Sequence, residues 1–234
     1  MNVAAVIWDY DGTLVDTRQK NLAVTREIVW EVLHKSFEEF PALATIENYE
    51  RANAASVNWR DLYGREFGMD EKQTDYAGTR WTHYQLKNTS NVLFFEGLHA
   101  TIAELGRHCP QGIVSLNSAA NIRRSLVENQ LDHFFSGIIG YEEVAFSRQK
   151  PDPAALVKCI SQLGLLEAEG PIVYIGDHET DAHCAINANH YFGKKKIVSI
   201  AALYEQPVAA LHWFYQPDHI AESTTHITRI IRDI

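Results

Sequence analysis

The chain has 234 residues, of which 46% are hydrophobic and 22% charged, and its formal net charge is -9. This composition is ordinary for a globular protein and excludes disordered, collagen-like and low-complexity classes. An acidic chain repels a phosphate backbone, so we expect no nucleic-acid partner. Because the sequence has no run of 18 apolar residues and no basic segment before its first apolar run, we expect neither a membrane span nor a secretory leader.

The cysteine content indicates a reducing compartment. Cys109, Cys159 and Cys184 are odd in number and form no CxxC pair, which is typical of reduced thiols. We therefore expect a cytoplasmic protein. The sequence makes no prediction about its oligomeric state.

Short apolar runs predict the strands of a buried parallel sheet. The first covers residues 3–8 and ends in a turn at Asp9, and similar runs occur at 112–116, 137–140, 171–175 and 197–202. Helical patterns separate them, at 98–108, at 121–129, from the cap residue Asp152 to Gly164, and at 180–189. This alternation predicts a doubly wound α/β sheet.

One stretch interrupts the alternation. No strand pattern is present between Asp16 and Asn91, whereas helical patterns cover 18–34, 45–55, 59–67 and 70–88. We therefore predict an all-helical domain at 16–91, inserted into an α/β domain made of 1–15 and 92–234. Trp8 and Trp30 are expected in the hydrophobic core.

Charged side chains follow three of the predicted strands, where ligands bind in α/β sheets. Asp9 and Asp11 follow the first strand, Asp177 and Asp181 follow the strand at 171–175, and Lys150 follows the strand at 137–140 after a loop. Gathering so many carboxylates is costly unless a cation joins them, and oxygen ligands favour a hard cation such as Mg²⁺. A divalent cation beside a lysine suits a phosphoryl group. Asp9 could then attack phosphorus, and Asp11 could exchange protons with the leaving oxygen and with water.

The order of these motifs resembles the haloacid dehalogenase superfamily. The segments DYDGTLVDT at 9–17, KPDPAAL at 150–156 and IGDHETDAHCAINAN at 175–189 match its first, third and fourth motifs, and the likeness extends over essentially the whole chain. Within the superfamily the chain looks like the members with a helical cap, including phosphoglycolate phosphatase-like enzymes. The resemblance implies a Rossmann-like core, a helical cap domain at 16–91 that closes over the substrate, and Mg²⁺-dependent phosphoryl transfer.

The resemblance also implies a role for each matched residue. Asp9 is the nucleophile and a metal ligand, and Asp11 is the acid/base and offers its backbone carbonyl to the metal. Lys150 steadies the nucleophile and the phosphate, Asp177 ligates the metal, and Asp181 supports it directly or through water. The second Asp of the first motif, present here as Asp11, disfavours dehalogenase and phosphonate-cleaving activities, since members with those activities lack it.

The second motif departs from the family pattern, which places Ser or Thr at a strand end, usually just before Asn or Gly. Aligned on Asn117, that position holds Leu116, which cannot donate a hydrogen bond to phosphate. Ser115 points to the opposite face if the strand is regular. We expect Asn117, or else Ser115, to contact the phosphate together with Lys150, and we expect Leu116→Ser to raise the rate.

The substrate is less readable than the reaction. Arg60 and Arg80 of the helical insertion are candidate substrate contacts, although exposed arginines usually only solvate a helix face. The sequence predicts a phosphatase of a small phosphorylated metabolite. It leaves open a phosphomutase, and also a degenerate member that binds a phosphorylated ligand without catalysis, as Leu116 suggests.

Overall fold

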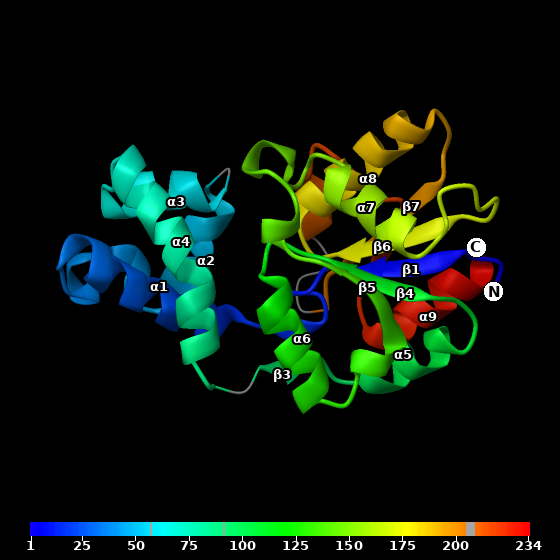
Figure 1. The fold of residues 1–234 in the computed structure, drawn as a ribbon, viewed down its shortest axis with the longest axis horizontal. Helices are drawn as coiled ribbons and strands as arrows, with labels where there is room; N and C mark the ends of the chain where they lie inside the picture. The colour runs from blue at the N-terminus through cyan, green and yellow to red at the C-terminus, as the bar shows by residue number, and fades with distance from the viewer. Residues whose placement is uncertain (57, 91, 205–208) are drawn as a thin grey trace. The chain divides into compact units, whose positions relative to one another are not determined.

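The structure is a computed structural model that describes residues 1–56, 58–90, 92–204 and 209–234 (Figure 1). The chain forms two compact units, one made of Met1–Asp16 and Leu93–Ile234 and one of Thr17–Val92. The sequence placed the insertion at 16–91, and its last residue, Asn91, lies outside the described residues.

The larger unit is built on a six-stranded sheet in the order β5-β4-β1-β6-β7-β8. Every pairing in it is parallel. The strands are β1 (Ala5–Trp8), β4 (Gln111–Val114), β5 (Phe135–Ile139), β6 (Ile172–Gly176), β7 (Ile197–Ala202) and β8 (His219–Ala221). All residues of β1, β4 and β6 are buried, as expected for strands covered on both faces. The predicted doubly wound, Rossmann-like fold is confirmed.

Helices cover both faces of this sheet. Figure 1 shows α7 (Ala154–Gln162) and α8 (Glu179–Phe192) on one face, and α5 (Leu98–Gly106) and α9 (Thr224–Asp233) on the other. A further helix, α6 (Ala119–Glu128), connects β4 to β5. The core under α7 and α8 contains apolar side chains from the sheet and from these two helices, including Ile7, Val114, Leu156, Tyr174 and Ala188. Burial of such side chains contributes roughly 1.5–3 kcal/mol each for the larger ones.

Two elements at the C-terminus were not predicted. The strand β8 has only three residues, too few to show a period. The helix α9 was missed although its buried Ile227, Ile230 and Ile231 recur at helical spacing. Another difference is at β4, which ends at Val114, two residues before the predicted end at Leu116. The other predicted strands end within one residue of the observed ends.

A short antiparallel ribbon marks where the chain leaves and re-enters the larger unit. It pairs β2 (Val15–Asp16) with β3 (Leu93–Phe94). Further short 3-10 helices lie at Phe37–Glu39, Pro41–Leu43, Asp132–Phe134, Tyr141–Glu143, Phe146–Arg148 and Ala209–His212.

The smaller unit consists of helices, as predicted from its period. They are α1 (Arg18–Leu33), α2 (Ile46–Ala54), α3 (Trp59–Phe67) and α4 (Glu71–Lys87). Side chains at three of the N-caps, Thr45, Asn58 and Asp70, accept backbone hydrogen bonds that start these helices. One core prediction was wrong: Trp30 in α1 is 59% exposed, whereas Trp8 is fully buried. A tryptophan on a helix with a weak apolar stripe cannot be assigned to the inner face from its hydropathy alone.

Candidate active site

Two neighbouring strands bring the first carboxylates together. β1 pairs with β6 so that Trp8 lies opposite Ile175, and the backbone N–H of Asp9 donates to the Ile175 carbonyl at 2.7 Å. Asp177 directly follows β6, and Asp181 lies in the first turn of α8. Because parallel strands end at the same edge of the sheet, residues far apart in the chain meet there.

Lys150 connects this group from a third segment, the loop between β5 and α7. Its Nζ donates to Asp9 Oδ1 and to Asp181 Oδ1, each at 2.7 Å, and its side chain is only 3% exposed. The hydroxyl of Tyr174 donates to the same Asp181 oxygen at 2.9 Å, and the His178 backbone N–H donates to the other at 3.2 Å. The buried ammonium of Lys150 has two carboxylate partners, which compensate its charge. Removing Lys150 or a carboxylate partner would leave an uncompensated buried charge.

Three of these carboxylates could hold a cation. Each of Asp9, Asp177 and Asp181 offers one oxygen, and these oxygens lie within 4.8 Å of one another. An all-oxygen donor set that lacks nitrogen and sulfur suits a hard divalent cation such as Mg²⁺ and not zinc. Asp181 already accepts three hydrogen bonds. Asp9 and Asp177 are therefore the carboxylates better placed to act as direct ligands.

The electrostatics of the cluster favour nearby cations. Burial raises the pKa of Asp9 to about 7; Lys150 opposes this shift, and the charge on Asp181 adds to it. Burial also raises the pKa of Asp177 well above its ordinary value, with Asp9 and Asp181 adding to the shift. Burial alone would lower the pKa of Lys150, yet the carboxylates of Asp181 and Asp9 raise it above its usual value. The lysine therefore stays charged, while the carboxylates favour a further positive charge.

The turn after β1 shapes the cluster through a glycine. Gly12 has a positive φ of 74°, and a Cβ at this position would lie 2.0 Å from Asp177 Oδ2. Only glycine combines this backbone conformation with so close an approach. The next residue, Thr13, donates from Oγ1 to Asp177 Oδ1 at 3.3 Å. The turn thus holds one carboxylate of the cluster directly.

Asp11 lies in the same turn but has a different partner. Asn117 Nδ2 donates to both of its carboxylate oxygens, at 3.1 Å and 3.0 Å. The Asn117 side chain was predicted as a phosphate contact, and the structure directs its amide nitrogen at Asp11. The bond joins the end of β1 to the loop that follows β4.

The remaining residues of that loop were also candidates. Ser115 is the first residue after β4 and is buried, and its Oγ accepts from the Asn117 backbone N–H at 3.1 Å. Leu116, between them, is 41% exposed. Phosphate contact by Ser115 or Asn117 stays a prediction.

Some residues of the cluster were not predicted. Tyr174, which donates to Asp181, lies inside the apolar run of β6 and gave no signal distinct from core packing. Gly176 is needed because a Cβ there would lie 2.3 Å from Asp181 Cγ. Its place directly before Asp177 in the fourth motif is the signal that could have found it.

The predicted specificity residues Arg60 and Arg80 lie in the helical unit, apart from the cluster in the chain. Arg60 forms an ion pair with Asp75, and Arg80 Nε pairs with Glu31 at 2.9 Å. Both guanidinium groups thus have carboxylate partners within their own unit. Their contact with substrate stays a prediction.

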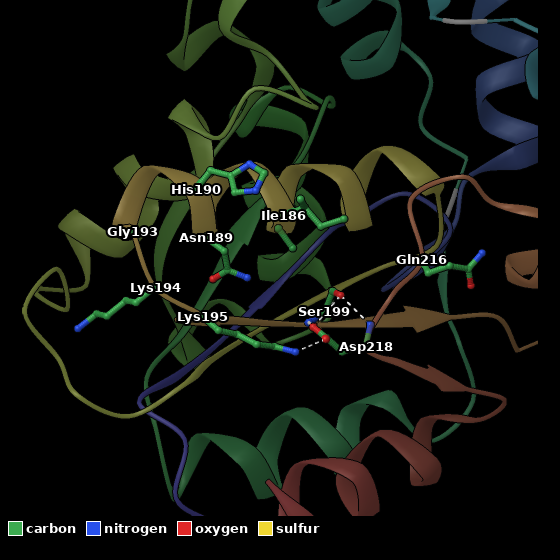
Figure 2. Close-up of a pocket in the computed structure, with 10 residues that line it drawn as sticks. Ile186, Asn189, His190, Gly193, Lys194, Lys195, Ser199, Gln216 and Asp218 are labelled. Atoms are coloured by element: carbon green, nitrogen blue, oxygen red, sulfur yellow. Dashed lines mark hydrogen bonds and ion pairs between the residues drawn. The ribbon is translucent and has the colours of Figure 1, made fainter.

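A pocket of about 520 Å³ lies elsewhere on the larger unit, beside α8 and β7. Figure 2 shows that its lining includes Lys195, whose ammonium pairs with Asp218, which also bonds Ser199. The candidate site residues Asp9, Asp11, Lys150, Asp177 and Asp181 do not line this pocket. Its volume therefore gives no reason to move the candidate site from the carboxylate cluster.

Within the described part of the chain, the helices are too short or too polar to cross a membrane.

Comparison with known families places the chain among hydrolases. The family of haloacid dehalogenase-like hydrolases matches residues 6–193, a span that contains Asp9, Asp11, Lys150, Asp177 and Asp181. A pyrophosphatase, PpaX of Listeria welshimeri, is 25% identical over 99% of this chain and 97% of its own length.

Solved structures agree with the fold. A haloacid dehalogenase-like hydrolase of Streptococcus pneumoniae has a TM-score of 0.72 and 18% identity, covering 98% of this chain and 99% of its own. A predicted phosphoglycolate phosphatase of Haemophilus somnus has a TM-score of 0.70 and 18% identity, covering 99% of each chain. At this identity the likeness establishes the architecture.

Proposed function

Because the chain belongs to the family of haloacid dehalogenase-like hydrolases, we propose that it is a Mg²⁺-dependent phosphatase of a small phosphorylated metabolite. The observation that carries this proposal is the bridge from Lys150 Nζ to Asp9 and Asp181, 2.7 Å each, beside a third carboxylate of a cation-binding set. A buried carboxylate held against one ammonium and one cation is suited to meet a phosphoryl group.

Asp9 is the proposed nucleophile. Lys150 occupies one of its oxygens, Oδ1, and no described residue donates a hydrogen bond to the other. That second oxygen attacks phosphorus and forms an aspartyl-phosphate as the bond to the leaving oxygen breaks. Water then attacks phosphorus, which releases inorganic phosphate and regenerates the carboxylate.

Asp11 is the proposed proton carrier of both steps. In its protonated form it donates to the oxygen that leaves phosphorus, and as a carboxylate it then accepts a proton from the attacking water. Its position on the same turn as Asp9, two residues on, suits this role.

Mg²⁺ would be held by Asp9, Asp177 and the backbone carbonyl of Asp11, with Asp181 supporting it directly or through water. When bound, it neutralises charge on the phosphoryl oxygens. Lys150 favours the ionised form of Asp9 and offers a donor to the phosphoryl oxygens. The helical unit would serve as the cap that excludes bulk water and selects the substrate.

The relatives suggest where to look for the substrate. Pyrophosphate and phosphoglycolate are the compounds in the names of similar proteins, so they head the panel to be tested. The net charge of -9 disfavours nucleic acid as substrate. A cytoplasmic location is part of the proposal, supported by three buried free cysteines.

The test is an assay of the purified protein with p-nitrophenyl phosphate, pyrophosphate, phosphoglycolate and a wider set of phosphate esters. Each is measured with Mg²⁺ and with a chelator, for the wild type and for Asp9→Asn. Turnover that requires both the cation and Asp9 supports the proposal. Turnover that survives in Asp9→Asn, or no turnover of any ester by folded protein with Mg²⁺, contradicts it.

A further inference from the structure

The loop after β4 contains a buried amide whose contacts reach into the candidate site. Asn117 is only 2% exposed, and both ends of its side chain are engaged. Its Oδ1 accepts from the Ser118 backbone N–H at 2.8 Å and from Asn121 Nδ2 at 3.2 Å. Its Nδ2 donates to the two oxygens of Asp11, as described above.

These contacts fix which way the amide faces. An amide NH2 group cannot accept a hydrogen bond, so the end that meets the Ser118 N–H donor must be the oxygen. The amide nitrogen therefore faces Asp11, whose two carboxylate oxygens accept its hydrogen bonds. A flipped amide would place oxygen against a carboxylate and nitrogen against an N–H donor, losing every one of these bonds.

The backbone around Asn117 is held as firmly as its side chain. Its N–H donates to Ser115 Oγ at 3.1 Å, and its carbonyl accepts from the Tyr141 N–H at 3.1 Å. Glu142 Oε1 accepts a hydrogen bond from the Ala119 N–H at 2.9 Å, so the loop after β5 is bonded to the start of α6. A Cβ at Gly140 would lie 2.3 Å from the Ala119 nitrogen, which shows how closely the two loops approach.

We propose that Asn117 is a positioning residue that holds the Asp11 carboxyl in the orientation from which it delivers a proton to the leaving oxygen. The inference rests on the proposed function, and it assigns Asn117 a role other than the phosphate contact predicted from the sequence. One donor that bridges both oxygens limits rotation of the carboxyl group, and pre-organisation of this kind supports proton transfer.

The role makes a distinctive prediction about leaving groups. In the first step the proton moves from Asp11 to the leaving oxygen as its bond to phosphorus breaks and the Asp9–phosphorus bond forms. A good leaving group such as p-nitrophenolate departs with little need of that proton, whereas phenolate needs it. Loss of orientation at Asp11 should therefore harm poor leaving groups most, while a general loss of packing would harm all esters alike.

The experiment compares kcat/KM over a series of aryl phosphates from p-nitrophenyl to phenyl phosphate, which differ mainly in the acidity of the phenol. We expect Asn117→Ser to lower kcat/KM by about 10- to 100-fold for phenyl phosphate and by less than about threefold for p-nitrophenyl phosphate. Asp11→Asn should make kcat/KM depend still more steeply on the acidity of the leaving phenol. The double variant should lose little beyond Asp11→Asn, because both substitutions remove one function.

Matched variants separate positioning from folding. Ser223→Ala removes the N-cap of α9, whose Oγ accepts from the His226 N–H, so it destabilises the same unit and should leave the leaving-group dependence unchanged. If Asn117→Ser does not fold, Asn121→Ala removes one of the two donors on Asn117 Oδ1 and should steepen the dependence in the same direction, by less.

The outcomes are distinguishable. An equal loss for all esters in the Asn117 variant, or no loss, overturns the inference while the phosphatase stands. If kcat/KM of Asp11→Asn does not depend on the acidity of the leaving phenol, the inference about Asn117 is also overturned, because Asp11 would then not be the acid. If Asp9→Asn keeps the wild-type activity, the proposed function itself fails.

Discussion

The Lys150 bridge and the loop at 115–118 both serve the same edge of the sheet, yet they hold their carboxylates by different means. The bridge uses charge: a buried ammonium lies between Asp9 and Asp181. The loop uses a neutral amide, fixed by neighbouring N–H groups, to hold Asp11. In the proposed mechanism, the residue that acts as an anion thus has a cationic partner, whereas the one that gains and loses a proton has a neutral one.

The largest effect should come from the charged side of this comparison. Lys150→Met leaves Asp9 and Asp181 buried without their shared partner, so we expect kcat to fall by about a thousandfold or more. Lys158→Met is the matched control, because Lys158 donates to Glu143 Oε2 at 2.6 Å but its side chain is 39% exposed. An exposed pair contributes at most about 1 kcal/mol, and this variant should keep its activity. Equal losses in both variants would show that burial of the bridge is not what matters.

A glycine substitution tests the close approach at the turn after β1. Gly12→Ala places a methyl group 2.0 Å from Asp177 Oδ2, so we expect loss of cation-dependent activity by about 100-fold or more. Gly164→Ala is the control, since its φ of 72° is nearly the same and its Cβ would meet nothing within 4 Å. Gly164→Ala should lower the free energy of unfolding by only about 1–2 kcal/mol, measured by urea denaturation, and should keep the wild-type activity. Retained activity in Gly12→Ala would mean that Asp177 is not held at this turn.

The raised pKa of Asp9 predicts how pH and the cation act together. Its pKa is about 7 in the folded, cation-free protein and about 3.8 in the unfolded chain. Between these values the folded state keeps a proton that the unfolded state has lost, so the free energy of unfolding falls as pH rises through this window. Mg²⁺ binds the ionised carboxylates, so the rise in Tm that it causes should grow from about pH 5 to about pH 8.

The control for this pH dependence is Asp9→Asn, which should weaken both trends because it removes one of the two carboxyls whose pKa is raised, the other being Asp177. A rise in Tm with Mg²⁺ that is the same at every pH would contradict the assignment of the cation to these carboxylates.

The smallest effect concerns Leu116. Its side chain is 41% exposed, so Leu116→Ser should leave the free energy of unfolding within about 0.5 kcal/mol. A hydroxyl at this edge adds a donor for phosphoryl oxygens, so we expect a gain of a few-fold in kcat/KM for p-nitrophenyl phosphate, on the order of 1 kcal/mol. A fall in rate with unchanged stability would show that the substrate uses the leucine.

The parts of the molecule that sequence could predict are those with a strong local pattern. Buried strands followed directly by charged residues indicated that Asp9 and Asp177 lie at one edge of the sheet, and the motif at 150–156 indicated Lys150. Helical periods with capping residues such as Asp70 located the helices of the smaller unit within one residue. The short strand β8 carried no period, and Trp30 on a helix with a weak stripe was misplaced.

The contacts that sequence could not predict are those that depend on how loops meet. Tyr174 looked like any residue of a buried strand, yet its hydroxyl reaches Asp181. The Asn117 amide was expected to face phosphate, and its nitrogen faces Asp11, because donors on α6 and its cap fix the oxygen end. No pattern along a single strand or helix encodes the meeting of the turn at 9–15 with the loop at 115–118.

The central claim is that Asp9 carries the phosphoryl group during turnover. Acid-quenching the enzyme during turnover of p-nitrophenyl phosphate with Mg²⁺, followed by peptide mass spectrometry, tests it most directly. We predict the added mass of one phosphoryl group on the peptide that contains Asp9, dependent on Mg²⁺ and absent from Asp9→Asn. Continued turnover by Asp9→Asn at the wild-type rate, or a phosphoryl group on another residue instead, would contradict it.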